Sequence, residues 1–131
     1  GQWLWSVLRG AGKNKFPLPE GEGEVRRIMI KLLYATFASK EEALSIAQKL
    51  LQEKLIACAN VLDGSTSVYR WQGEVQEASE VILFAKTTDK QAQKAASRIK
   101  ELHSYELPCV LILPVESGLP EFMEWVETET S

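Results

Sequence analysis

ACANVLDGSTSVYRWQG, residues 57–73, is the stretch that decides the fold of this chain. It contains good strand formers, but it is too long and too polar to be one buried strand. The pattern predicts a long strand that bends near Asp63 and Gly64 and turns at Gln72 and Gly73. Such a strand extends past the core of a small domain, so its far end must pair or remain an exposed edge. We therefore expect a second copy of the chain to pair with it.

The size and composition of the chain indicate one ordinary globular domain. It has 131 residues, of which 45% are hydrophobic and 25% charged. The net charge of −3 argues against a nucleic-acid partner. Two cysteines, Cys58 and Cys109, are too few for a disulfide framework. They favour free thiols in a reducing compartment, so we expect the protein in the cytoplasm.

Residues 1–28 differ in composition from the rest of the chain. Residues 3–8 form an apolar run that is too short to span a bilayer, and glycines and prolines follow it. We expect this segment to be an N-terminal extension, a linker or a remnant of cloning. If it is instead a processed transit segment, the protein would lie in an organelle. Residues 29–131 form the predicted domain, and no membrane-spanning segment is predicted.

The predicted elements alternate in a recognisable order. Residues 30–37 read as a buried strand, and Ser39 with Glu42 form a capping box that starts an amphipathic helix. After the long strand, we expect a strand at 81–85, a helix from Thr88, a strand at 109–113 and a short helix opening at Pro120. This order is the α+β, ferredoxin-like split βαβ arrangement, βαββαβ with a C-terminal helix. One sheet face lacks a cover within the chain, so we expect other subunits to bury it.

From residue 30 to residue 127, the chain resembles the CutA family of divalent-cation tolerance proteins. The resemblance rests on residues 53–60 (EKLIACAN), 66–73 (TSVYRWQG), 80–81 (EV), 86–87 (KT), His103, Tyr105, Pro108 and 122–126 (FMEWV). It implies a homotrimer of ferredoxin-like subunits whose sheets face the trimer axis and whose long strands pair between subunits. It also implies a role in tolerance to copper and other divalent metals. No established reaction comes with the family.

His103 and Cys58 are the candidate metal ligands. A thiolate suits Cu(I), and His103 is the single imidazole in the chain. The alternatives are a small core cysteine and a histidine that closes a helix. Some relatives place a histidine and a cysteine, proposed as copper ligands, where this chain has Leu102 and Ala35. We therefore expect weak binding of copper or another divalent ion and no complete site.

A second candidate set consists of Tyr69, Trp71, Lys86 and Tyr105. Tyr69 and Trp71 alternate with Arg70, so they point to the same sheet face. The resemblance places these positions near clefts between subunits, where aromatic walls and a lysine could hold a small ligand. The alternative is packing at the subunit interface. The competing hypothesis is thus a trimeric signalling or scaffold protein that binds a small ligand or a partner protein in these clefts.

We do not expect an enzyme. No serine or cysteine in the sequence has a general base close by, so no catalytic constellation is visible. The predicted partners are other copies of the chain and metal ions.

Overall fold

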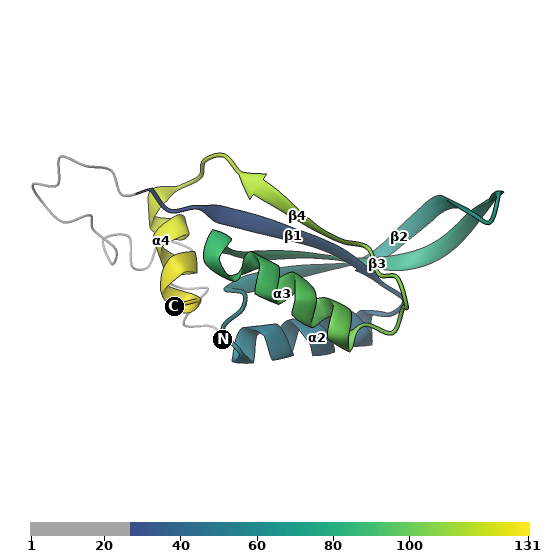
Figure 1. The fold of residues 1–131 in the computed structure, drawn as a ribbon, viewed down its shortest axis with the longest axis horizontal. Helices are drawn as coiled ribbons and strands as arrows, with labels where there is room; N and C mark the ends of the chain where they lie inside the picture. Colours follow the sequence, from purple (N-terminus) through teal and green to yellow (C-terminus); the bar gives the residue numbers. More distant parts are fainter. Residues whose placement is uncertain (1–26) are drawn as a thin grey trace, which may run out of the picture.

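The computed structural model describes residues 27–131, which form a four-stranded antiparallel sheet with three helices (Figure 1). The strand order is β2-β3-β1-β4, as in the predicted ferredoxin-like arrangement. The expectation for residues 1–28 falls almost entirely on residues outside the described part, so it stays a prediction. In chain order the elements are β1 (Ile30–Phe37), α2 (Lys40–Gln52), β2 (Cys58–Trp71), β3 (Glu74–Thr88), α3 (Asp89–Leu102), β4 (Val110–Val115) and α4 (Pro120–Glu129).

The main core lies between the sheet and helices α2 and α3, which cover the same face (Figure 1). Alternate residues of β1 and β3 point to these helices, since successive strand side chains face opposite ways. The fully buried side chains include Leu33, Phe37, Leu50, Leu83 and Ile99. Ser39 caps α2 as predicted, because its Oγ accepts a hydrogen bond from the Glu42 amide at 3.1 Å. The predicted return contact, from the Glu42 side chain to Ser39, is wrong, because that carboxylate binds Ser104 instead.

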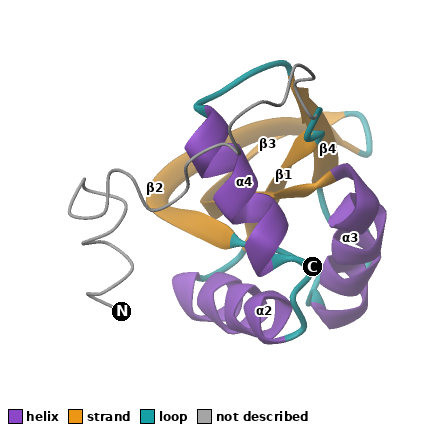
Figure 2. Ribbon diagram, turned by 90° about the vertical axis from the view of Figure 1, so that its left-hand side faces the viewer, coloured by secondary structure: helices purple, strands orange, loops and turns teal. Residues whose placement is uncertain are grey.

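Helix α4 packs across the end of the sheet where β1 begins, as Figure 2 shows from that side. Trp125 and Val126 form a second, smaller core with Ile30 and Ala57. Partly buried side chains around this core include Cys58 and Val115. This helix therefore closes one end of the domain and places the start of β2 in an apolar surrounding.

Strands β2 and β3 continue past the sheet as a two-stranded arm (Figure 1). A β-bulge between Leu62 and Ser65 bends β2 where the sequence predicted, and Gly64 has a φ of +84° there. At the tip, Trp71 pairs with Glu74 across the turn residues Gln72 and Gly73, whose φ values are +50° and +81°. Both central residues are left-handed, which is the type I′ hairpin turn.

Strand β3 is much longer than the predicted strand at 81–85. The prediction counted only the apolar residues, whereas residues 74–80 join the strand by pairing with β2. Strand β4 extends to Val115 and contains Pro114, which an edge strand tolerates.

The sheet face opposite α2 and α3 is apolar, and we call it the open face. Cross-strand registers place on it the side chains of Leu32, Tyr34, Leu62, Ile82, Phe84, Leu111 and Leu113. Leu111 is 56% exposed, and Leu62 and Leu113 are also exposed. Within residues 27–131 no helix or strand covers these side chains, and no helix there is long and apolar enough to cross a membrane.

Candidate functional site

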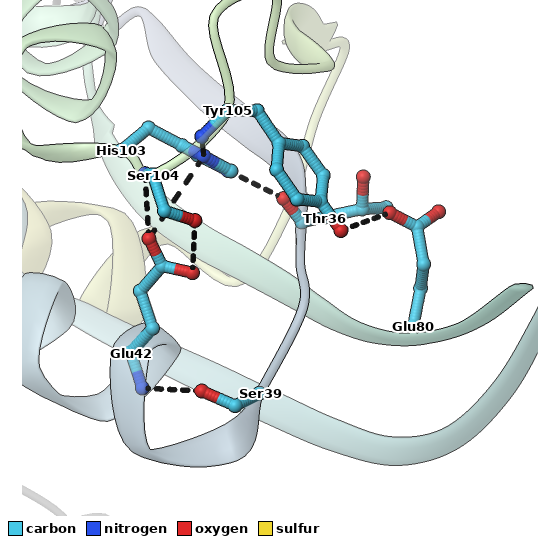
Figure 3. A network of polar contacts seen from close by, with 7 residues as sticks. All are labelled: Thr36, Ser39, Glu42, Glu80, His103, Ser104 and Tyr105. Carbon is cyan, nitrogen blue, oxygen red and sulfur yellow. Dashed lines mark hydrogen bonds and ion pairs between the residues drawn. The ribbon is translucent and has the colours of Figure 1, made fainter.

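His103 lies at the centre of a polar network at the end of the sheet from which the arm departs (Figure 3). It follows α3, and its side chain is 0% exposed. The ring stacks on Phe37 with 4.6 Å between ring centroids and an interplanar angle of 14°. Nε2 donates a hydrogen bond to the carbonyl oxygen of Thr36 at 2.7 Å, and Nδ1 accepts one from the Tyr105 amide at 3.0 Å. Both ring nitrogens are therefore used inside the protein.

Glu42 ties helix α2 to the loop that follows α3. Its carboxylate accepts hydrogen bonds from the Ser104 amide at 2.7 Å and from the Ser104 hydroxyl at 3.0 Å. The same carboxylate lies 4.0 Å from Nδ1 of His103 (Figure 3). Charge-assisted bonds of this kind are the stronger class of hydrogen bond, so Glu42 holds the loop against the helix layer.

Tyr105 joins this loop to the base of the arm. Its hydroxyl donates a hydrogen bond to Glu80 of β3 at 3.2 Å (Figure 3). Burial, and then the neighbouring Glu80 carboxylate, raise the pKa of the Tyr105 phenol. Tyr69 contributes a smaller electrostatic effect in the same direction.

A second polar group surrounds Lys86 on the same sheet face as the open-face residues. Lys86 pairs directly with Cys58 across the β2–β3 ladder, and its ammonium donates a hydrogen bond to the Asn60 side-chain oxygen. Burial raises the pKa of the Cys58 thiol, while the charge of Lys86 and its hydrogen bond to the thiol act in the opposite direction. The thiol is thus held beside an amine at the edge of the α4 core.

The structure keeps the two candidate metal ligands apart within one chain. Cys58 lies opposite Lys86, which pairs with Leu32, whereas His103 binds Thr36, four residues further along β1. At about 3.3 Å per strand residue, this separates the two sites by roughly 13 Å. No group of three or more His, Cys, Asp or Glu side chains suited to a metal gathers anywhere in residues 27–131. One chain's described residues therefore do not fit a resident metal centre.

The predicted cleft residues do not gather in one place. Tyr105 lies at the base of the arm, where it binds Glu80, whereas Tyr69 and Trp71 lie toward the tip and are 43% and 55% exposed. Lys86 is six residues along β3 from Glu80, or about 20 Å at the usual rise. A cleft containing all of them would need more than one copy of the chain.

No site role was predicted from the sequence for Glu42, Ser104 or Asn60. Glu42 carried a signal, the capping box, but that signal assigned its carboxylate to Ser39. The partners of Glu80 and Asn60 come from residues at least 25 positions away, so no local pattern marks them.

Comparisons with known proteins agree with this fold. A family profile described as "CutA1 divalent ion tolerance protein" matches residues 31–129. The chain is 41% identical over 102 residues to "Divalent-cation tolerance protein CutA" of Thermus thermophilus, which covers 78% of this chain and 99% of the relative. It is 31% identical over 127 residues to "Protein CutA" of Mus musculus, covering 97% and 71% of the two chains.

The fold of this chain is also similar to that of solved structures. The crystal structure of the divalent ion tolerance protein CutA1 from Ehrlichia chaffeensis superposes with a TM-score of 0.77 at 35% sequence identity. The superposition covers 81% of this chain and 99% of that one.

Proposed function

Because the chain belongs to the family of CutA1 divalent ion tolerance proteins, we propose that it acts in tolerance to divalent cations, as a homotrimer. The observation that carries the assembly is the open face. Leu62, Leu111 and Leu113 expose apolar surface on a sheet face that the described part of the chain leaves uncovered. Contiguous apolar patches on soluble proteins mark association surfaces. The arm supplies a second one, since its two strands project beyond the core of their own subunit.

The assembly is tested by sedimentation of the purified protein at micromolar concentration. A trimer is expected for the wild type. Leu111→Glu places a charge on the open face and is expected to give monomers or unfolded chains. Leu44→Glu is the matched control, because Leu44 is an exposed leucine on α2 and not on the open face. A monomeric wild type would overturn the proposal.

We propose further that copper or another divalent ion binds weakly and through side chains of more than one subunit. The separation of His103 from Cys58 within a chain supports this, as does the use of both His103 nitrogens in hydrogen bonds. The test is a competition-buffered Cu(I) and Cu(II) titration of wild type, Cys58→Ser and Cys109→Ser. Binding that vanishes in Cys58→Ser while the assembly persists supports the role of Cys58. An unchanged affinity in both variants contradicts it.

A signalling or scaffold role is the second candidate. It is favoured by the exposed aromatic side chains of the arm, Tyr69 at 43% and Trp71 at 55%, which share one face. Trp71→Ala would then remove binding of the small ligand or partner, while the affinity of the protein for copper stays unchanged. We propose no enzymatic activity, and we propose the cytoplasm as the location, to be checked by cell fractionation.

The activity itself is tested by growth of cells that lack their own copy of the protein, in medium with added copper. The wild-type chain is expected to restore growth. Restoration by Cys58→Ser and loss in Trp71→Ala would favour the scaffold role over direct metal binding.

A further inference from the structure

The pairing of Cys58 with Lys86 places a thiol and a primary amine side by side on the sheet. The two residues are directly opposed on neighbouring strands, so their side chains leave the same face. Directly opposed residues have Cβ atoms about 4.5–5.5 Å apart, which a lysine side chain easily spans. The charge of the Lys86 ammonium favours the ionised form of the thiol, although burial has the larger effect and raises the pKa of Cys58.

The surroundings restrict both groups. Cys58 packs on the core formed by Ile30, Ala57, Trp125 and Val126, so the sulfur has little freedom to move away. Lys86 is held from its other side by Asn60, which accepts a hydrogen bond from the ammonium. The other thiol, Cys109, is exposed and lies before β4, at the far end of the sheet from Cys58. Lys86 is therefore the basic side chain against which Cys58 is placed.

We propose that Cys58 and Lys86 form a reversible covalent cross-link, a sulfenamide, when the protein meets hydrogen peroxide. In the first step the sulfur takes one oxygen from the peroxide, giving Cys58 sulfenic acid and one water molecule. A sulfenic acid condenses readily with a nearby nitrogen. In the second step the Lys86 ammonium gives one proton to solvent and its nitrogen attacks the sulfur. The sulfenic hydroxyl leaves with the second proton as water, so an S–N bond replaces the S–O bond.

The cross-link would act on both the fold and the surface. It would join the first residue of β2 to β3 beside the α4 core, and it would remove the positive charge of Lys86 from this sheet face. Thiols reduce sulfenamides, so a cellular thiol would restore both side chains.

The experiment uses the full chain in its native assembly, carrying Cys109→Ser so that a disulfide cannot mimic the result. The protein is treated with hydrogen peroxide and its intact mass is measured. The expected product has lost two hydrogen atoms and gained no oxygen. Trypsin should no longer cleave after Lys86, and the peptide of residues 55–70 should be joined to that of residues 71–90. Dithiothreitol should restore the original mass and the cleavage.

Lys86→Arg is the matched variant, because it keeps the charge and the trypsin site but removes the nucleophilic amine. It is expected to lose the cross-link and to gain oxygen on Cys58 instead. Asn60→Ala serves as a second variant in case Lys86→Arg proves unstable. It removes the acceptor of the Lys86 ammonium but keeps the amine, so the cross-link should still form. Two outcomes overturn the proposal: oxygen gain alone in the parent protein, or the same loss of hydrogen in Lys86→Arg, which would place the bond on another nitrogen.

Discussion

His103 and Thr36, which are 67 residues apart in the chain, are joined by a 2.7 Å hydrogen bond from the ring Nε2 to the main-chain oxygen. The bond fixes the end of α3 to the end of β1, and the stacking of the ring on Phe37 buries the contact. Because Nδ1 accepts from the Tyr105 amide, the ring is the neutral tautomer with its proton on Nε2. The histidine therefore works as a linker between main-chain groups.

Removing this imidazole is expected to destabilise the protein strongly. His103→Ala leaves the Thr36 oxygen and the Tyr105 amide without their partners and opens a cavity beside Phe37. Each buried group left unpaired costs about 1–3 kcal/mol, so we expect a loss of about 2–4 kcal/mol in the free energy of unfolding. Urea denaturation at fixed protein concentration measures it. Ser104→Ala removes only the exposed bond from its hydroxyl to Glu42, because the main-chain amide bond remains, and it should cost less than about 1 kcal/mol. Equal losses in the two variants would contradict the linker role.

Lys54 is a site where glycine should stabilise the protein. It follows α2 with a φ of +60°, a left-handed conformation that costs a residue with a Cβ about 1–2 kcal/mol. Its amide bonds to Leu51, which any residue can preserve. Allowing for the greater entropy of glycine in the unfolded chain, Lys54→Gly should raise the free energy of unfolding by about 0.5–1 kcal/mol. Lys54→Ala keeps the Cβ and should bring no such gain; if the two variants prove equally stable, the conformational explanation is wrong.

The arm turn offers a pair of opposite changes. Gly73→Ala puts a Cβ at a φ of +81° with open space around it, so the cost of about 1 kcal/mol is purely conformational. Gln72→Asn, at a φ of +50°, replaces a poor type I′ residue by a favoured one and should stabilise the turn slightly. Thermal unfolding should shift down in the first variant and up in the second. Shifts of the same sign would contradict the assigned turn type.

Tyr105 should ionise later than a free tyrosine. Burial and Glu80 raise its pKa above the usual value of about 10. A raised pKa in the folded state means that the stabilising effect is fully present below about pH 10 and is lost as pH rises through the higher, folded value. An alkaline titration followed by tyrosinate absorbance should show a late step, and Tyr105→Phe should remove it. Persistence of that step in the variant would assign it to Tyr34 or Tyr69.

Local patterns predicted most of the fold but little of the polar network. Three features depend only on residues close together in the sequence and were therefore predicted: the apolar run of β1, the Ser39 cap, and the turn at Gln72 and Gly73. The first half of β3 was missed because its stability comes from pairing with β2 and not from burial. The environment of His103 could not be foreseen for a related reason. Its partners are main-chain atoms, which leave no mark on residue identity, and one of them is 67 residues away.

The bulge at Asp63 and Gly64 also limits which insertions and deletions β2 can accept during evolution. Before it, Cys58, Asn60 and Leu62 share a sheet face with Lys86, Phe84 and Ile82, and after it the odd-numbered residues from Ser65 take over that face. Losing one residue here would turn the far half over, exchanging Val68 with Tyr69 and Trp71. The arm can thus gain or lose residues only in matched numbers on its two strands, and descendants of this chain should vary in arm length by even steps.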